Sequence, residues 1–419
     1  MTDAELRDQA VAALERTTVG YRNKLWKTPP AGSQWAKGLA LLAQIDAGPQ
    51  PPIPAVILPL PPAPYNTIPA SATPVNSSAA LLKALAANTP SVVLDDGTYD
   101  NPVAFQDTGT SIYSRNLGKA VFTAAIAITN PTNPVTIQGP KMSVSDPAKG
   151  GAYGSCLSVW DSQSKGVTLL DLAVDGNKAL PYGVWGGLAP NLAFQRATLT
   201  GFRPANGVYP VAARLENSGI AQTISYQQIS DLDISDVTAQ GQSNGTAEVG
   251  LWVGHQTVNG VQRIRVRLVS LASIETVNDC HDTTFEDITI DMSGANQAGQ
   301  WTVGVYHEHF SNNLTFNREN MVGVHQGHTC EWDDGTPGNQ AVNNLTVTDA
   351  VIDASGCNKP RACGIYGDAG TNGITATNVT FKNQDWAAIG AFQNKVPPVA
   401  KNCVYEMLAG AVPLSTDHI

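Results

Sequence analysis

The sequence has little charge, few cysteines and no long apolar run. Only 14% of its 419 residues are Asp, Glu, Lys or Arg, while the apolar fraction is an ordinary 42%. Gly, Pro, Ser, Thr and Asn take the place of the missing charge, and these residues disfavour long surface helices and favour short strands separated by turns. Composition alone therefore predicts an all-β chain.

The charge balance and the hydropathy exclude two classes of partner. The chain carries 25 basic and 35 acidic residues, a net charge of -10, and such a surface repels nucleic acid and anionic membranes. The sequence contains no apolar stretch of about 18 residues, the length needed to span a bilayer. Residues 1–16 are typical of a charged helix rather than a signal peptide, so we expect synthesis in a cytoplasm, without export or membrane insertion.

Cysteine and histidine give no sign of a metal site. Six cysteines without a CxxC pair are too few for a disulfide framework. Cys357 and Cys363 flank a short loop and could form a disulfide, but buried thiols are the favoured interpretation. Six of the seven histidines fall within residues 255–328, and four of these are in HEH (307–309) and HQGH (325–328), yet no cysteine accompanies them at a spacing known for zinc. We therefore predict no metal and no cofactor.

Residues 1–74 predict a small helical module followed by a stalk. Thr2 and Glu5 form a capping box for a helix to about residue 16, and a second amphipathic helix follows Ser33 and ends near residue 48. Across residues 49–74, ten of 26 residues are proline, which forces extended polyproline II structure. This linker is either an interdomain spacer or a segment that lies along a partner through Ile53, Val56, Ile57 and Leu58.

Residues 75–406 repeat one short pattern, and residues 407–419 form a C-terminal tail. In each repeat an Asp, Asn or Arg precedes alternating apolar residues, at intervals of 22–35 residues. Equivalent positions keep their character from repeat to repeat, as parallel stacking of strands requires, which favours a solenoid over an antiparallel sandwich or a propeller. The repeats begin at Asp171, Arg196, Asp231, Arg265, Asp287, Arg318, Asp349, Asn378 and Asn402.

The start of this region carries a family resemblance. The segment SAALLKALAAN followed by SVVLDDGTYDNPVAF resembles the cap helix and first-rung "DGTY" element of the pectin-lyase-like superfamily. The resemblance covers roughly residues 75–406 and implies a right-handed parallel β-helix solenoid. Its cap helix would cover the open edge of the first coil, which would otherwise invite aggregation.

A second strand-like pattern, such as Gly183-Val-Trp, precedes the repeated element in successive coils and predicts an aromatic outer stripe. Because side chains alternate along a strand, inward-pointing Val184 and Val305 leave their next neighbours pointing outward. Aromatic faces stacked along a solenoid suit sugar rings, whereas burial by a long loop or a neighbouring subunit is the alternative. The stripe comprises Trp185, Tyr209, Trp252, Glu275, Tyr306 and Tyr366, of which the five aromatic residues are the candidate glycan-binding residues.

Acidic residues fall on the same predicted stripe. Glu308 lies two residues beyond Tyr306, Asp368 two beyond Tyr366, and a rung through TCEWDDG turns Glu331 and Asp333 outward. Carboxylates one or two rungs apart are separated by about 5–9.5 Å, the range of glycoside hydrolysis, and clustering raises the pKa of one of them. The alternative is solvent-facing acids near turns. The candidate catalytic residues are Glu308, Asp333, Glu275, Glu331 and Asp368, with Glu308 and Asp333 as the preferred pair.

The N-terminal module carries a second resemblance. The segment TTVGYRNKLWKTPPAGSQWAKGLALLAQI is similar to N-terminal modules of minor tail proteins from phages of actinobacteria, with Tyr21, Trp26 and Trp35 as the matching aromatic residues. The resemblance implies attachment to other virion tail proteins, with the β-helix contacting host-surface polysaccharide outside the cell. Similar tailspikes are homotrimers, which here would form by lateral packing of solenoids. A polysaccharide depolymerase and a purely structural virion component are the alternative functions.

Overall fold

The structure is a computed structural model. It describes residues 68–419 apart from residues 107, 163–164, 190, 206, 217–226, 239–247, 255–257, 270, 278–279, 294–301, 309–310, 332–341, 358–359 and 418–419. The predicted helical module at residues 1–48, with Tyr21, Trp26 and Trp35, lies outside the described residues, as does most of the linker.

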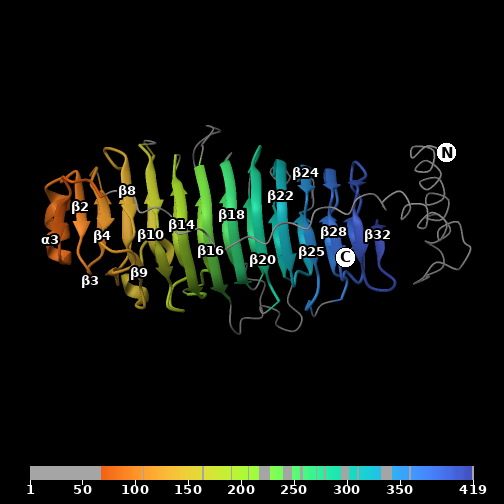
Figure 1. The fold of residues 1–419 in the computed structure, drawn as a ribbon, viewed down its shortest axis with the longest axis horizontal. Coiled ribbons are helices and arrows are strands. Elements are labelled where there is room, and N and C mark those ends of the chain that lie inside the picture. The colour runs from red at the N-terminus through yellow and green to blue at the C-terminus, as the bar shows by residue number, and fades with distance from the viewer. Residues whose placement is uncertain are drawn as a thin grey trace, which may run out of the picture.

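The described chain is a right-handed parallel β-helix, as predicted from the sequence. Each complete coil contributes strand segments to three parallel ladders, and the coils follow one another from α3 to β32 (Figure 1). The third ladder is a 12-stranded sheet of its own: β4 (Val103–Gln106), β7 (Ile126–Thr129), β10 (Ser155–Trp160), β13 (Tyr182–Leu188), β15 (Val211–Glu216), β17 (Val249–Gly254), β19 (Ala272–Val277), β21 (Val303–His307), β23 (Gln326–Cys330), β26 (Cys363–Gly367), β29 (Ala387–Ala391) and β32 (Val412–Ser415).

The other two ladders form one 20-stranded sheet, because five long strands run through both. The first ladder contains β1 (Thr73–Val75), β2 (Ser91–Leu94), β5 (Ser111–Ser114), β8 (Val135–Gln138), β11 (Val167–Leu170), β24 (Asn343–Thr348), β27 (Asn372–Thr377) and β30 (Val399–Lys401). The second contains β3 (Gly97–Tyr99), β6 (Ala120–Phe122), β9 (Lys141–Ser143), β12 (Ala173–Asp175), β25 (Val351–Asp353), β28 (Thr380–Lys382) and β31 (Val404–Glu406). The shared strands are β14 (Ala193–Phe202), β16 (Gln227–Val237), β18 (Val258–Val269), β20 (Thr284–Asp291) and β22 (Asn312–Val322).

Helix α3 (Ser78–Ala86) covers the N-terminal end of the solenoid, where the sequence predicts a cap (Figure 1). The Ser77 side chain accepts a hydrogen bond from the amide of Ala80 and so begins the helix, which buries Leu81 and Leu85. Burying each such leucine contributes about 1.5–3 kcal/mol. Two short 3-10 helices, η1 (Pro147–Lys149) and η2 (Ala152–Gly154), lie before β10.

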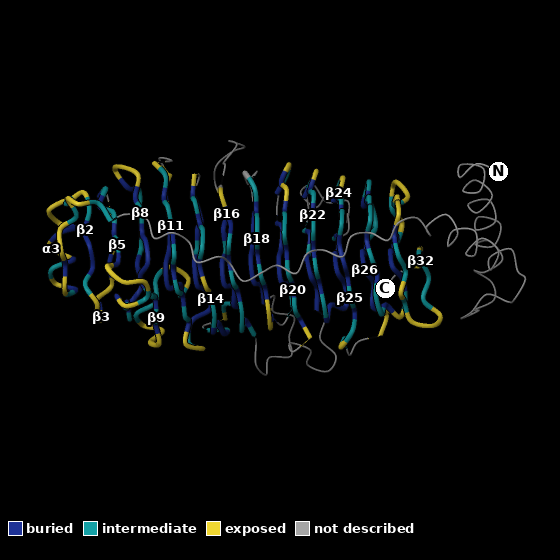
Figure 2. Tube along the Cα trace, viewed as in Figure 1, coloured by how far each residue is buried: buried dark blue, intermediate teal, exposed yellow. Residues whose placement is uncertain are grey.

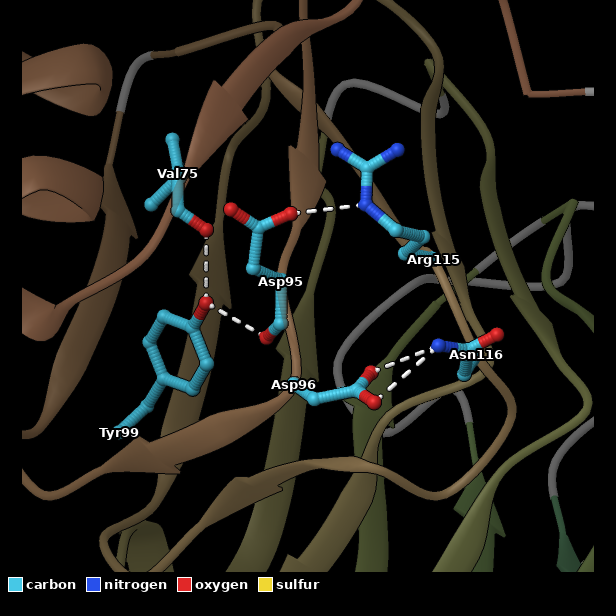
Figure 3. A network of polar contacts seen from close by, with 6 residues as sticks. All are labelled: Val75, Asp95, Asp96, Tyr99, Arg115 and Asn116. Atoms are coloured by element: carbon cyan, nitrogen blue, oxygen red, sulfur yellow. Dashed lines mark hydrogen bonds and ion pairs between the residues drawn. The ribbon is translucent and has the colours of Figure 1, made fainter.

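Polar contacts of the "DGTY" element join the cap to the first coils (Figure 3). The Tyr99 hydroxyl donates to the carbonyl oxygen of Val75 at 2.8 Å and lies 3.1 Å from that of Asp95. One coil further on, Arg115 donates to the Asp95 carboxylate at 2.8 Å and Asn116 donates to that of Asp96 at 3.0 Å. The element therefore holds β1, β3 and the loop after β5 in register.

Inward-pointing aliphatic side chains stack from coil to coil and form the core. The central inward column of the 12-stranded sheet aligns Val184, Leu251, Ile274 and Val305, all fully buried. Figure 2 shows the same alternation, with buried segments within the strands and the exposed ones chiefly at turns and over the cap. His328 is the polar member of this column, between Val305 and Ile365.

The repeated Asp, Asn or Arg marks a bend between the first and second ladders. Each of these residues has a positive φ of 52–60°, a left-handed conformation that Asp and Asn adopt more readily than most residues. One predicted member is wrong: the bend in β18 is at Arg263, and Arg265 lies two residues later, paired with Asp233. The stacked bend residues are Asp171, Arg196, Asp231, Arg263, Asp287, Arg318, Asp349, Asn378 and Asn402, and we call them the bend ladder.

The parallel stacking continues past Glu406, the predicted end of the solenoid. Strand β32 (Val412–Ser415) pairs with β29 and adds a rung from within residues 407–419. Cys357 and Cys363 are thiols and do not form a disulfide. Within the described part of the chain, none of the helices is long and apolar enough to cross a membrane.

Candidate functional site

One outward column of the 12-stranded sheet carries most of the predicted stripe. Strand pairing places Trp185, Trp252, Glu275, Tyr306 and Tyr366 in this column, each pointing away from the core. Successive rungs are about 4.8 Å apart. The column also contains Arg214 on β15 and Thr329 on β23, which were not predicted from the sequence.

The prediction that Tyr209 belongs to this column is wrong. Gly207 has a φ of 76° and lies in a tight turn before β15, so the rung is formed by VAARLE, with Arg214 outward. Alternation within VAARLE is the signal that could have found this rung, but it lacks the Gly-apolar-aromatic pattern. Tyr209 nevertheless reaches the same surface, where its ring stacks on Trp252 with centroids 6.0 Å apart.

A second outward column, two residues further along each strand, carries the acids. The amide of Glu308 donates to the carbonyl of Thr276, that of Glu331 to His307 and that of Asp368 to Cys330, so the three acids lie on successive rungs. The Asp368 carboxylate accepts a hydrogen bond from the amide of Ala369 within its own turn. Asp333, the predicted partner of Glu308, lies outside the described residues.

Glu275 lies on β19, next to the rung of Glu308, and is only 3% exposed. Burial raises its pKa well above the usual range, and the negative charges of Glu308 and Glu331 add to the effect. One carboxyl oxygen shares a hydrogen bond with Glu308, and the other, Oε2, is buried with no hydrogen-bond partner among the described residues. The raised pKa favours the protonated form of Glu275, which is the form that a proton donor needs. We call Glu275, Tyr306, Glu308 and Glu331 the acid cluster.

Tyr306 orients one carboxylate of the acid cluster. Burial, together with the charge of Glu331 and a hydrogen bond to it, raises the pKa of Tyr306 far above that of a free phenol. Tyr306 therefore remains protonated and donates to Glu331, which fixes the orientation of that carboxyl group. The cluster thus pairs a buried acid, Glu275, with an oriented carboxylate, Glu331.

Arg214 is the only cation in the two outward columns among the residues described, and its charge is neutralised locally. Its guanidinium donates to the Glu216 carboxylate at 3.1 Å and to the hydroxyls of Tyr182 at 3.2 Å and Tyr209 at 3.1 Å. It also stacks 4.3 Å above the Trp252 ring. Burial disfavours its charge, but Glu216 and the tyrosines outweigh this effect and raise the pKa of Arg214.

Exposed aromatic rings gather at one end of the stripe. Tyr153 is 63% exposed and packs 4.9 Å from Trp185, and Trp160, 36% exposed, stacks 6.0 Å from the same ring. We call these three residues the aromatic patch. By contrast, Trp252 and Tyr366 are buried beneath neighbouring side chains of their own chain, so their faces are covered.

His307 of HEH and the two histidines of HQGH are buried, and His309 lies outside the described residues. His307 and His328 are fully buried inside the solenoid, as the alternation around Glu308 predicts for His307. Their rings stack, and His328 donates or accepts through Nε2 to the buried carboxyl of Glu319 at 2.8 Å. Among residues that the structure describes, no group of three or more metal-ligating side chains has the geometry to hold an ion.

No protein-family model and no curated protein match the sequence. Similar solved structures include the Agl-KA catalytic domain, with a TM-score of 0.47 and 12% identity over 84% of this chain and 70% of that one. The catalytic domain of a GH87 alpha-1,3-glucanase in complex with nigerose gives 0.42 and 11%, covering 84% and 67%. Alginate lyase from Paenibacillus sp. str. FPU-7 gives 0.38 and 11%, covering 83% and 98%. Identities this low describe a likeness of fold alone.

Proposed function

We propose that the outer face of the 12-stranded sheet binds a glycan along the solenoid axis and hydrolyses it with the acid cluster. The observation that carries the proposal is Glu275, a buried carboxyl group beside two further acids, whose pKa is raised by its burial and by their charge. A general acid in a glycosidase needs this property, and a partner carboxylate must lie within reach of the same bond.

The roles follow from the environments of the three carboxyl groups. Glu275 protonates the glycosidic oxygen, Glu308 keeps it protonated through its charge, and Glu331 acts on the anomeric centre, oriented by Tyr306. Strands β19 and β23 are two rungs apart, and Glu275 and Glu331 lie in different outward columns. The anomeric configuration of the product would show whether Glu331 attacks the sugar or activates a water molecule.

Charge favours an uncharged glycan over a uronate polymer. The face carries several carboxyl groups, and Arg214, the one cation among the described residues of the two outward columns, is already paired with Glu216. A polyanion would be repelled, and no unpaired cation in the two described columns could neutralise the carboxylate that β-elimination requires. Cleavage of polygalacturonate or alginate faster than of neutral cell-wall glycan would contradict this choice.

The activity test follows the appearance of new reducing ends when the protein is incubated with neutral host cell-wall glycan. Hydrolysis gives saturated products, whereas a lyase gives unsaturated ones that absorb in the ultraviolet. Glycan binding with no new ends would favour a pure adhesin. Trp185→Ala removes the ring shared by the aromatic patch and should weaken binding about tenfold, because one stacked sugar contributes about 1 kcal/mol or more. Lys178→Ala, at an exposed turn residue, is the control.

We further propose that the protein is a phage tail protein. The support is the similarity of its N-terminal sequence, with Tyr21, Trp26 and Trp35, to tail modules of actinobacterial phages. On this proposal it is made in the host cytoplasm, joins the virion through residues 1–48 and meets host glycan as a homotrimer. Virions assembled with a protein that lacks residues 1–48 should contain none of it, and sedimentation at micromolar concentration should give a trimer.

A further inference from the structure

A chain of buried polar side chains crosses the solenoid interior directly behind the acid cluster. Glu319 Oε2 lies 2.8 Å from His328 Nε2, His328 Nδ1 lies 3.2 Å from His307 Nε2, and His307 Nδ1 lies 2.9 Å from the Thr276 hydroxyl. The Ser311 hydroxyl follows at 3.2 Å from that of Thr276. All five side chains are fully buried, and we call them the interior chain.

These residues interrupt columns that are otherwise aliphatic. His328 stands between Val305 and Ile365, and Glu319 stacks on Ile288 of the preceding coil. Aliphatic side chains in such places are commonly as stable as a buried polar network or more so, because they avoid desolvation of polar groups. Core stability alone therefore gives no reason for a carboxyl group and two imidazoles at this level of the solenoid.

The interior chain and the acid cluster share their strands. On β19, Thr276 points inward beside outward Glu275, and on β21 His307 points inward between Tyr306 and Glu308. The carbonyl oxygen of Thr276 accepts the amide of Glu308 at 2.8 Å and also the Ser311 hydroxyl at 3.3 Å. The interior chain thus ends on the same carbonyl group that holds the backbone of Glu308.

Two arrangements of protons satisfy the interior chain. When Glu319 is ionised, each donor points toward it: Thr276 donates to His307, His307 to His328 and His328 to Glu319. When Glu319 carries a proton, it donates to His328 and every bond reverses, so that His307 donates to Thr276. The titratable groups around it are Cys330 on β23 within the core and Glu275, Tyr306, Glu308 and Glu331 on the outer face.

We propose that the interior chain is a positioning device for the acid cluster, which sets the hydrogen bonding at the Thr276 carbonyl and thereby the placement of Glu308 beside Glu275. The measurements of kcat that test this inference rest on the proposed hydrolysis. It also predicts a signal that needs no turnover, because the Glu308 amide should sense the state of Glu319.

The experiment compares three variants. In Glu319→Gln the side chain keeps its size but cannot ionise, so the interior chain loses the charged acceptor that favours the first arrangement; we expect wild-type thermal stability and a changed pH profile of kcat. The triple variant His307→Leu, Glu319→Met, His328→Leu should keep or raise the thermal midpoint, yet lose about tenfold in kcat with KM nearly unchanged. Gln384→Met, which removes another buried amide in a later coil, should leave kcat and its pH profile unchanged.

The second readout is the amide resonance of Glu308 in NMR spectra of isotopically labelled protein. We expect it to shift in Glu319→Gln and in the triple variant, and to stay in place in Gln384→Met. If the wild-type protein cleaves no glycan, the proposed function fails while this shift still supports the inference. An unmoved Glu308 amide in Glu319→Gln, or a wild-type kcat and pH profile in that variant, would overturn it. Should the triple variant fail to fold, Glu319→Gln alone decides.

Discussion

Two charged regions of this solenoid follow opposite rules. In the bend ladder the sign of charge alternates from coil to coil between Asp171 and Asp349. The ion pairs are Arg196–Asp171 at 2.7 Å, Arg263–Asp231 at 2.5 Å and Arg318–Asp287 at 2.6 Å. In the acid cluster three carboxyl groups of one sign gather on neighbouring strands, with Arg214 held apart by Glu216.

The difference separates what stabilises the fold from what supports chemistry. Stacking in a parallel β-helix brings equivalent residues of successive coils about 4.8 Å apart, so like charges in one column repel unless their signs alternate. The bend ladder meets this requirement at partly exposed positions. The acid cluster does not, and burial with like charge raises the pKa of Glu275 instead. A column that departs from alternation is thus a candidate site.

Replacing Glu275, the buried acid of the cluster, should have the largest effect on hydrolysis. Glu275→Gln preserves the size and hydrogen bonding of the protonated carboxyl group but cannot donate its proton, so hydrolysis should fall about 10²- to 10⁴-fold. Reducing-end assays at saturating glycan measure the loss. Glu286→Gln, which removes a carboxylate from β20 on the other sheet, is the matched control and should retain activity. Full activity in Glu275→Gln would exclude Glu275 as the general acid.

The same substitution should change stability in a direction set by pH. Because the pKa of Glu275 is raised in the folded state, its contribution is fully present below the unfolded-state pKa of about 4.3 and is lost as pH rises through the folded value. Glu275→Gln should match the wild type near pH 4 and become the more stable protein as pH rises, at up to about 1 kcal/mol per pH unit. Thermal unfolding from pH 4 to pH 9 measures the difference, and parallel curves would contradict the raised pKa.

Neutralising Glu308 tests how much the charge of a neighbouring acid contributes to the raised pKa of Glu275. Glu308→Gln removes the largest charge that acts on Glu275, so the pKa of Glu275 should fall toward its usual range. The alkaline limb of the pH profile of kcat reports the general acid and should move to lower pH, while the maximal rate changes less than in Glu275→Gln. Asp368→Asn, one rung beyond Glu331, is the control. An unmoved alkaline limb would mean that burial alone holds the proton on Glu275.

Alternation within strands was enough to predict the placement of much of the site. It placed Trp185, Glu275 and Tyr306 outward, and Glu308 and Glu331 on neighbouring rungs. The β-helix itself followed from repeated turn residues and a cap helix, both of which are local signals.

The site residues that could not be placed from the sequence depend on the register between coils. Intervals of 22–35 residues leave the rungs at β15 and β23 without a fixed spacing, so Arg214 and Thr329 were missed and Tyr209 was misplaced. The interior position of Glu319 was missed for a different reason, since an acid between Arg318 and Asn320 is typical of a polar surface turn. The raised pKa of Glu275 arises from residues of three separate coils, and no local pattern reports it.

The smallest predicted effect tests whether alternation in the bend ladder matters. Arg318 pairs with Asp287, and its side chain is 42% exposed, so Arg318→Gln should cost less than about 1 kcal/mol. Arg318→Asp imposes the rule of the acid cluster on the ladder, because three carboxylates would then follow one another from Asp287 to Asp349, and it should cost more than Arg318→Gln in low salt. Thermal midpoints in low and high salt measure the effects of both substitutions. Lys382→Gln, which breaks the exposed Lys382–Glu406 ion pair outside the ladder, is the control. If Arg318→Asp matched Arg318→Gln in both salts, like charges would be tolerated in any column, and the same-sign acids on the outer face would lose their distinction as a mark of function.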